Sequence, residues 1–328
     1  MDVAFISLRA VHTGALVALL GGLVFAIWVV RSSARVRLDG DSDTHARLIR
    51  WSARWLALAF ISGAGWLGFE AILMSGLPPA QALSGETLSV VLLQTQFGRV
   101  WIGRCILCLI LAALLLVSPR ADSERRRIVV LMCTAVAAAL IATLALAGHA
   151  NSEHGPQRLV HLAADATHLL AAGAWVGALP ALVGMIARQR RSPERVGLDE
   201  VARATQRFSL LGVISVGVLI ASGGVNAWFT VGTFETLFKT HYGHLLLVKL
   251  ALFGGMLVLA AVNRMRLTPL LSDAGMSPPV RTAAQRSLQR NAAVEALLAL
   301  LVLGIVGALG TTMPAAHSPE MTPSMHMP

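Results

Sequence analysis

Residues 97–148 read FGRVWIGRCILCLILAALLLV, then SPRADSERRR, then IVVLMCTAVAAALIATLALAG. Two long apolar runs thus flank a short loop that is rich in arginine. A helix of about twenty apolar residues spans the roughly 30 Å hydrocarbon core of a bilayer. The stretch therefore predicts two transmembrane helices that are joined by a loop at one membrane surface.

The whole chain repeats this pattern. Its 328 residues are 55% hydrophobic and 13% charged, and the mean hydropathy is +0.68. A soluble domain of this size carries about twice that share of charged residues. We predict eight spans, near residues 4–30, 52–74, 97–117, 127–148, 158–187, 206–231, 243–263 and 288–311. Backbone groups in hydrocarbon must bond within their own segment, so the prediction is an all-α polytopic membrane protein.

The chain is interpreted as one eight-helix bundle, residues 1–311, followed by a flexible Met- and His-rich tail, residues 312–328. No small-residue cleavage site follows the first apolar run, which predicts a retained helix rather than a signal peptide. A short helix over Thr87–Thr95 is expected at the outer surface.

Basic residues predict the orientation. The loops 31–54, 118–127, 188–207 and 264–290 hold 21 of the 27 Lys and Arg residues, whereas the loops between them contain only Lys239. By the positive-inside rule, the arginine-rich loops face the cytoplasm and both termini face outward. This pattern also explains the net charge of +10 without a nucleic-acid partner.

Histidines gather on the predicted outer side. Nine of the ten lie there, namely His12, His149, His154, His161, His168, His241, His244, His317 and His326. Imidazole is a ligand for copper, zinc, iron and nickel. The distribution therefore favours a metal site, although a single histidine in a span can instead bond two helices together.

The spacing of the histidines along the chain indicates which of them are candidate metal ligands. His161, Asp165 and His168 are four and three residues apart, which places them on one face of a helix. Asp165 can orient an imidazole by accepting its second N–H. His12 lies in the first span and His149 ends the fourth. We therefore predict one metal centre that is built from these four histidines and Asp165.

The tail points to copper. It contains Met313, His317, Met321, Met325, His326 and Met327. Thioether selects for reduced copper, so the tail is a candidate for copper capture, or else an ordinary disordered terminus. Cys105, Cys108 and Cys133 lie inside spans, which argues against disulfides. Cys105 and Cys108 are weaker soft-metal candidates that can equally be packing residues.

Other polar groups within the spans have structural explanations. Lys249 and Arg104 are expected to pair with Asp165 or Glu70, and Glu295 with a nearby arginine, because buried charges need partners.

Several segments resemble the CopD-type copper-resistance membrane proteins. The matching segments are His12-Thr13-Gly14, Gly148-His149-Ala150, DATHLLAAGAWVG at 165–177, SGGVN at 222–226, and Asn263-Arg264. The resemblance covers nearly the whole chain and is strongest over residues 148–311. It implies an eight-helix bacterial inner-membrane protein that carries copper inward from a periplasmic copper-binding partner. Its functional positions map to His12, His149, Asp165, His168 and Asn226.

The expected function is therefore copper binding and copper import, without enzymatic activity. No P-loop is present, so transport would use a gradient or mass action. One alternative is a b-type cytochrome in which His12, His149 and His168 supply haem ligands. The other is a docking site for a periplasmic copper chaperone that transports nothing.

Overall fold

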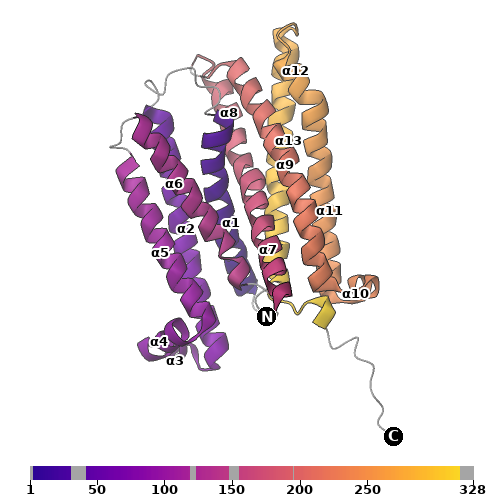
Figure 1. Cartoon of the computed structure of the whole chain (residues 1–328). Helices are drawn as coiled ribbons and strands as arrows, with labels where there is room; N and C mark the ends of the chain where they lie inside the picture. The colour runs from indigo at the N-terminus through magenta and orange to yellow at the C-terminus, as the bar shows by residue number, and fades with distance from the viewer. Residues whose placement is uncertain (1–2, 31–41, 119–122, 148–154, 195, 318–328) are drawn as a thin grey trace.

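The computed structural model describes residues 3–30, 42–118, 123–147, 155–194 and 196–317. Regular structure in these residues is entirely helical (Figure 1). Eight segments are long and apolar enough to cross a membrane: Val3–Val30, His45–Ser75, Gln96–Val117, Glu124–Ala147, Pro156–Arg191, Leu198–Val231, His241–Ser272 and Pro278–Leu309. The predicted all-α bundle of eight spans is confirmed.

The spans are built mainly from long α-helices. These are α1 (Val3–Val24), α2 (Ser42–Ser75), α5 (Gln96–Val117), α6 (Ser123–Ala142), α7 (Pro156–Trp175), α8 (Leu179–Arg191), α9 (Leu198–Val231), α11 (His241–Val262) and α13 (Pro278–Leu309). Four short helices connect them: α3 (Pro79–Ala82), α4 (Gly85–Gln94), α10 (Phe234–Lys239) and α12 (Thr268–Ser272). The expected short helix near 87–95 is thus present as α4.

The fifth span is broken in its middle. A 3-10 turn at Val176–Ala178 separates α7 from α8. Pro180 near the start of α8 has no N–H to donate, which interrupts the helical bonding. The break lies where this span touches α1. A Cβ added to Gly177 would stand 1.9 Å from the backbone oxygen of Val17, so only glycine fits there. The small residue thus lets these two helices approach closely.

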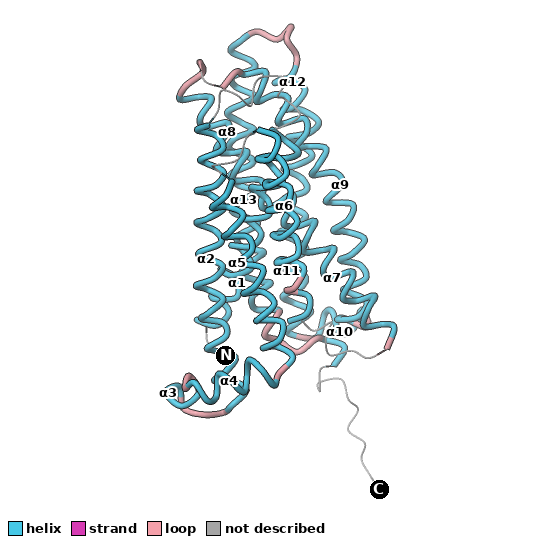
Figure 2. Tube along the Cα trace, turned by 60° about the vertical axis from the view of Figure 1, so that its left-hand side comes forward, coloured by secondary structure: helices cyan, strands magenta, loops and turns pink. Residues whose placement is uncertain are grey.

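Two apolar cores lie on either side of this contact. One contains buried residues of α1, α2, α5 and α6, and the other contains residues of α7, α8, α9, α11 and α13. α1 touches both groups, since it contacts α2, α6, α7 and α13. Figure 2 shows the helices running side by side along the long axis of the bundle.

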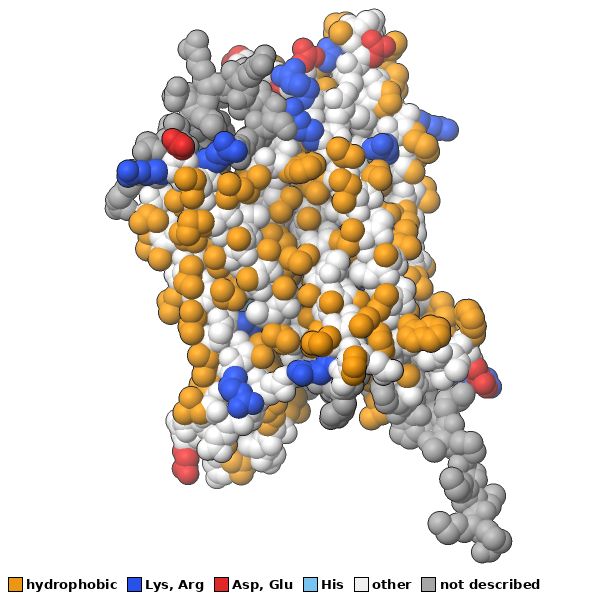
Figure 3. Space-filling view, viewed as in Figure 1, with side chains coloured by type: hydrophobic (Ala, Val, Ile, Leu, Met, Phe, Trp, Pro, Cys, Tyr) orange, Lys and Arg blue, Asp and Glu red, His pale blue; other side chains and the backbone are white. Residues whose placement is uncertain are grey.

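The outer surface of the bundle is apolar in its middle. Leu109, Val258 and Leu300 have exposed fractions of 69%, 65% and 63%. In Figure 3, hydrophobic side chains cover a broad central band, and most charged side chains lie above or below it. Apolar side chains in that position face lipid tails in a membrane, as a transmembrane bundle requires.

The start of α1 and the end of α13 lie at one end of the bundle, together with α3, α4 and α10 (Figure 1). The arginine-bearing end of α8, with Arg188, Arg190 and Arg191, lies at the other end. These three arginines thus lie at the end of the bundle opposite to the start of α1, as the alternation of the loops predicts. That the first end faces the periplasm stays a prediction, which rests on the positive-inside rule.

Candidate metal centre

α7 presents its predicted polar face to α9. The helix begins after Gly155, whose φ of +71° suits glycine, and Pro156 occupies the first turn, where its missing N–H costs nothing. His161 is buried, and Asp165 and His168 are half-buried.

Three residues of α9, which are also four and three positions apart, lie opposite this face. Ser222 contacts His168, Asn226 contacts Asp165, and Phe229 stacks on His161. Because the two helices run antiparallel, residues with spacings of four and three on each helix meet as three successive pairs. We call these three pairs the α7–α9 ladder.

The first pair determines which ring nitrogen of His168 carries the hydrogen. Nδ1 of His168 lies 3.1 Å from Oγ of Ser222, whose own hydroxyl donates to the carbonyl of Val218 at 2.6 Å. Since the single hydroxyl proton is used there, Ser222 accepts from His168, and Nδ1 carries the hydrogen. Nε2 of His168 is then the nitrogen with a free lone pair, which is the form that binds a metal ion.

The second pair leaves a buried acceptor unsatisfied. Nδ2 of Asn226 donates to Oδ1 of Asp165 at 3.4 Å. Oδ1 of Asn226 is buried and has no hydrogen-bond partner among the described residues. An orphaned buried acceptor costs about 1–3 kcal/mol, so it calls for an explanation in a native structure.

The third pair and α11 complete the surroundings. The rings of His161 and Phe229 are stacked, with centroids 4.7 Å apart and planes inclined by 10°. Lys249 of α11 lies within electrostatic range of both Asp165 and His168. An ion pair between Lys249 and Asp165 stays a prediction.

His12 belongs to a different environment between α1, α2 and α5. Its Nδ1 lies 2.9 Å from the backbone oxygen of Ala59 and 3.2 Å from Oγ of Ser62. A carbonyl only accepts, so Nδ1 carries the hydrogen and Nε2 is the acceptor. Arg104 of α5 donates from Nη2 to that Nε2. Both nitrogens of His12 are therefore occupied.

Aromatic rings hold Arg104 in place. Its guanidinium carbon lies 5.7 Å from the ring centre of Trp66 and 5.2 Å from that of Trp101. Arg104 is only 3% exposed. It was expected to pair with Asp165 or Glu70, but the structure pairs it with His12; the indole of Trp66 donates to Glu70 at 2.9 Å. No local sequence signal links positions 12 and 104, which lie on separate spans.

The cysteines are free, as expected. Cys105 and Cys108 line a small cavity of about 20 Å³ together with His12 and Arg104. The guanidinium already occupies the side of the cavity where His12 presents Nε2. Cys133 is buried among apolar residues of α6 and its neighbours.

Several predicted ligands fall elsewhere. His149, Met321, Met325, His326 and Met327 lie outside the described residues. Met313 is 59% exposed just beyond α13, and the backbone of His317 ends a short 3-10 turn, Ala315–His317. Ala315 packs with Val231 at the end of α9, Tyr242 in the first turn of α11 and Leu309 at the end of α13, so the described start of the tail is anchored on the bundle.

Within the described part of the chain, no group of three or more His, Cys, Asp or Glu is close enough to hold a metal ion. His161, Asp165 and His168 share one helix face, whereas His12 contacts another set of helices. The single centre of four histidines and Asp165 stays a prediction, because His149 is not described. The sequence alone does not identify Ser222 and Phe229 as partners of His168 and His161. Their spacing of four and three residues from Asn226 is the signal that could have found them.

Comparison with known proteins identifies the family. Residues 1–159 match the family model described as "Copper resistance protein D-like, N-terminal domain", and residues 202–309 match "Copper resistance protein D". Copper resistance protein D of Pseudomonas syringae pv. tomato is 31% identical over 81% of this chain and 85% of its own length. The chain belongs to the copper resistance protein D family. This confirms the resemblance that the sequence motifs indicated.

Two further proteins that are similar to this chain have informative names. Inner membrane protein YebZ of Escherichia coli K12 is 31% identical over 81% of this chain and 84% of its own length. Copper transport protein CutJ of Bacillus subtilis 168 is 31% identical over 56% of this chain but only 30% of its own length. None of these names mentions haem. Most of α7, including Asp165 and His168, lies between the two ranges that the family models match.

Proposed function

We propose that this chain binds copper in the outer half of its bundle and moves it inward across the inner membrane. Membership of the copper resistance protein D family supports a role in copper handling. Eight apolar helices and the similarity to an inner membrane protein support a multi-pass inner-membrane location. The names of the relatives describe resistance and transport proteins rather than enzymes, so we infer no catalysis.

The proposed docking site rests on two polar atoms of the α7–α9 ladder that have no hydrogen-bond donor among the described residues. Within the described ranges, no residue donates to Nε2 of His168, and Oδ1 of Asn226 is buried without a partner. Asp165 accepts a hydrogen bond from Asn226, and its carboxylate would add negative charge to the site when ionised. A bound cation would satisfy the orphaned oxygen and use the free imidazole nitrogen, which a purely structural network would leave idle.

The other predicted ligands would bind the copper ion before or after His168. His161 adjoins Asp165 one turn away on α7 and extends the docking site. His12 becomes a ligand only after Arg104 leaves its Nε2, so it would act after His168. We propose that His149, which follows the fourth span, completes the outer face of the site.

Copper would reach this site from the periplasm. With both termini outside, the residues Met313, His317, Met321, Met325, His326 and Met327 would capture copper there, either directly or from a periplasmic copper-binding protein. Methionine and histidine together suit reduced copper.

The test is copper flux into proteoliposomes that contain the full chain. We expect copper uptake by the native protein and its loss in Asp165→Asn, which keeps the shape of the side chain but removes its charge. His244→Ala is the matched control, because His244 is exposed and its Nε2 bonds to the backbone oxygen of Phe238. It should transport like the native chain.

Tight copper binding without any flux in the native chain would contradict transport and would favour the docking-site alternative. Equal flux in Asp165→Asn and the native chain would contradict the proposed site.

A further inference from the structure

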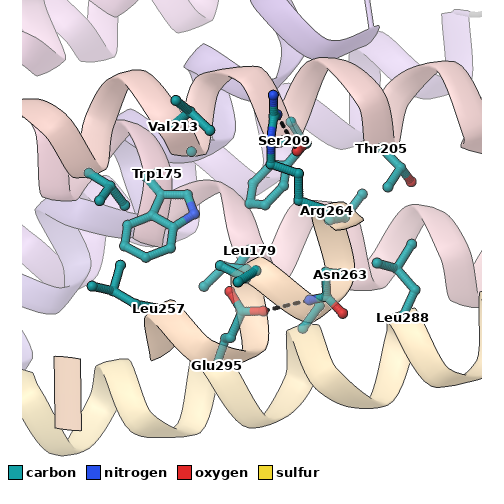
Figure 4. Close-up of a pocket in the computed structure, with 17 residues that line it drawn as sticks. Trp175, Leu179, Thr205, Ser209, Val213, Leu257, Asn263, Arg264, Leu288 and Glu295 are labelled. Atoms are coloured by element: carbon teal, nitrogen blue, oxygen red, sulfur yellow. Dashed lines mark hydrogen bonds between the residues drawn. The ribbon is translucent and has the colours of Figure 1, made fainter. Parts of the chain in front are cut away.

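A cavity lies between α8, α9, α11 and α13 (Figure 4). Its lining includes Leu182 of α8 and Arg264 just after α11, which places it toward the arginine-bearing end of the bundle. Its volume is about 240 Å³, far above the roughly 10–15 Å³ that one water molecule needs. Most of its lining is apolar, including Trp175, Leu179 and Leu257. The α7–α9 ladder and the His12 environment contribute none of the residues that line it.

One carboxyl group faces this apolar space. Glu295 of α13 is only 1% exposed and lines the cavity. Asn263 donates to its Oε1 at 2.6 Å, and Asn291 donates to Asn263 at 2.9 Å (Figure 4 shows the first of these bonds). No described residue donates to Oε2. The two asparagines thus fix the carboxyl group while one of its oxygens stays available on the cavity side.

Glu295 has no cationic partner among the described residues. It was expected to pair with an arginine, and the structure contradicts this: the nearby Arg264 donates from Nη1 to Oγ of Ser209 at 2.9 Å instead (Figure 4). An isolated ionised carboxylate inside a span is costly, and such groups often act in proton relays. A merely structural hydrogen bond between α11 and α13 would need only an amide, which is much cheaper to bury.

The chemistry of the lining selects the ligand. Its polar atoms are oxygen and nitrogen without thiol, thioether or imidazole, so it does not suit reduced copper. Arg264 is the other charged residue of the lining, and its fixed positive charge opposes a metal cation. A proton can be carried through the cavity by water and bound on the carboxyl group itself.

We propose that Glu295 is a proton-binding site that exchanges protons with the arginine-bearing side of the membrane through this cavity. In the binding step, the carboxylate takes a proton from hydronium to give a carboxylic acid and water, and the release step reverses this. Proton binding does not depend on the copper function. That the proton is the coupling ion for copper movement rests on the proposed transport function.

The surroundings of Glu295 leave few competing groups. α8 contributes Leu179 and Leu182 to the cavity, and α9 contributes Thr205 and Ser209 as its hydroxyl residues. None of these titrates in the ordinary pH range. Of the titratable and charged residues, only Glu295 and Arg264 line the cavity, and Arg264 stays charged throughout.

Infrared spectroscopy of the purified full chain during a pH titration tests the site directly. We expect the carbonyl stretch of a protonated carboxyl group to appear as the pH falls, and to shift in heavy water. Glu295→Gln should remove this band, and Glu295→Asp should restore a carboxyl band. Glu235→Gln is the matched control, because Glu235 is exposed and paired with Lys239, and it should leave the band unchanged.

Persistence of the same band in Glu295→Gln, or its absence from the native chain at every pH, would overturn the proposal. Copper flux with an imposed pH gradient then tests the coupling: the gradient should accelerate the native chain but not Glu295→Gln. If no chain transports copper, the transport function fails while the infrared result still decides whether Glu295 binds a proton.

Discussion

His12 and His168 occupy opposite halves of the same bundle and differ in one hydrogen bond. Each imidazole has Nδ1–H bonded to an oxygen, from Ala59 in one case and Ser222 in the other. Nε2 of His12 receives a hydrogen bond from Arg104, whereas no described residue donates to Nε2 of His168. The neighbouring side chain therefore decides whether the second ring nitrogen is already bonded, and we propose that the open nitrogen of His168 binds the metal.

The two halves also differ in what surrounds the imidazole. Around His12, the rings of Trp66 and Trp101 enclose a guanidinium, which is an arrangement that excludes a second cation. Around His168, the α7–α9 ladder offers a carboxylate and an amide oxygen. Lys249 also lies within electrostatic range of His168 and Asp165, so both imidazoles have a cation nearby. The difference is that Arg104 donates to Nε2 of His12, whereas no described residue donates to Nε2 of His168.

The largest expected effect concerns the contact that joins the halves. Gly177→Ala places a Cβ 1.9 Å from the backbone oxygen of Val17. Neither backbone can move far enough to relieve this clash without a loss of stability. We expect a loss of at least about 3 kcal/mol, since overpacking here cannot be absorbed by a flexible side chain. A strongly lowered midpoint of thermal unfolding in detergent would show this.

Gly184→Ala is the control for that prediction, because a Cβ on Gly184 meets nothing within 4 Å. Alanine favours a helix over glycine by about 1 kcal/mol, so this variant should be at least as stable as the native chain. Equal unfolding midpoints for the two variants would mean that the halves are not held together at Gly177.

Removal of Arg104 should destabilise the His12 half. Arg104→Ala leaves Nε2 of His12 buried without its donor, which costs about 1–3 kcal/mol, and it also removes the contacts with Trp66 and Trp101. Thermal unfolding should detect the loss, while copper binding at the ladder stays unchanged. Arg99→Ala, an exposed change on the same helix, serves as control. An Arg104→Ala chain as stable as Arg99→Ala would show that the pairing contributes nothing.

A pair of serine variants compares the two imidazoles more finely. Ser222→Ala removes the acceptor that orients His168, and loss of such a partner typically weakens metal binding about 10–100-fold. Ser62→Ala removes the corresponding contact of His12 and should leave copper affinity unchanged. Isothermal titration with copper measures both, and an equal effect of the two changes would erase the distinction between the histidines.

Apolar runs and helical spacing in the sequence were sufficient to predict the fold and part of the candidate site. Apolar runs predicted all eight spans because hydrocarbon imposes one length and one backbone solution on each. The spacing of His161, Asp165 and His168 predicted their shared face because helix geometry is local. Contacts between spans were harder: Arg104 meets His12 across 92 positions, and helix packing alone brings them together.

The partner of Glu295 shows the same limit in another way. An arginine was the expected partner because buried charge usually seeks opposite charge. Asn263 lies close because α11 and α13 pack side by side, and Arg264 on the next position points to Ser209 of α9 instead. A one-residue step along a helix turns a side chain by about 100°, and sequence without packing does not tell which of the two faces α13.

A competition titration of reduced copper against a chromogenic chelator tests the central contrast most directly, with the native chain, His168→Ala and His12→Ala side by side. We expect His168→Ala to weaken binding about 100-fold, or about 2.8 kcal/mol, and His12→Ala to weaken it less than about tenfold. An affinity that falls as far in His12→Ala as in His168→Ala would contradict the assignment of His168 as the open ligand and His12 as the closed one.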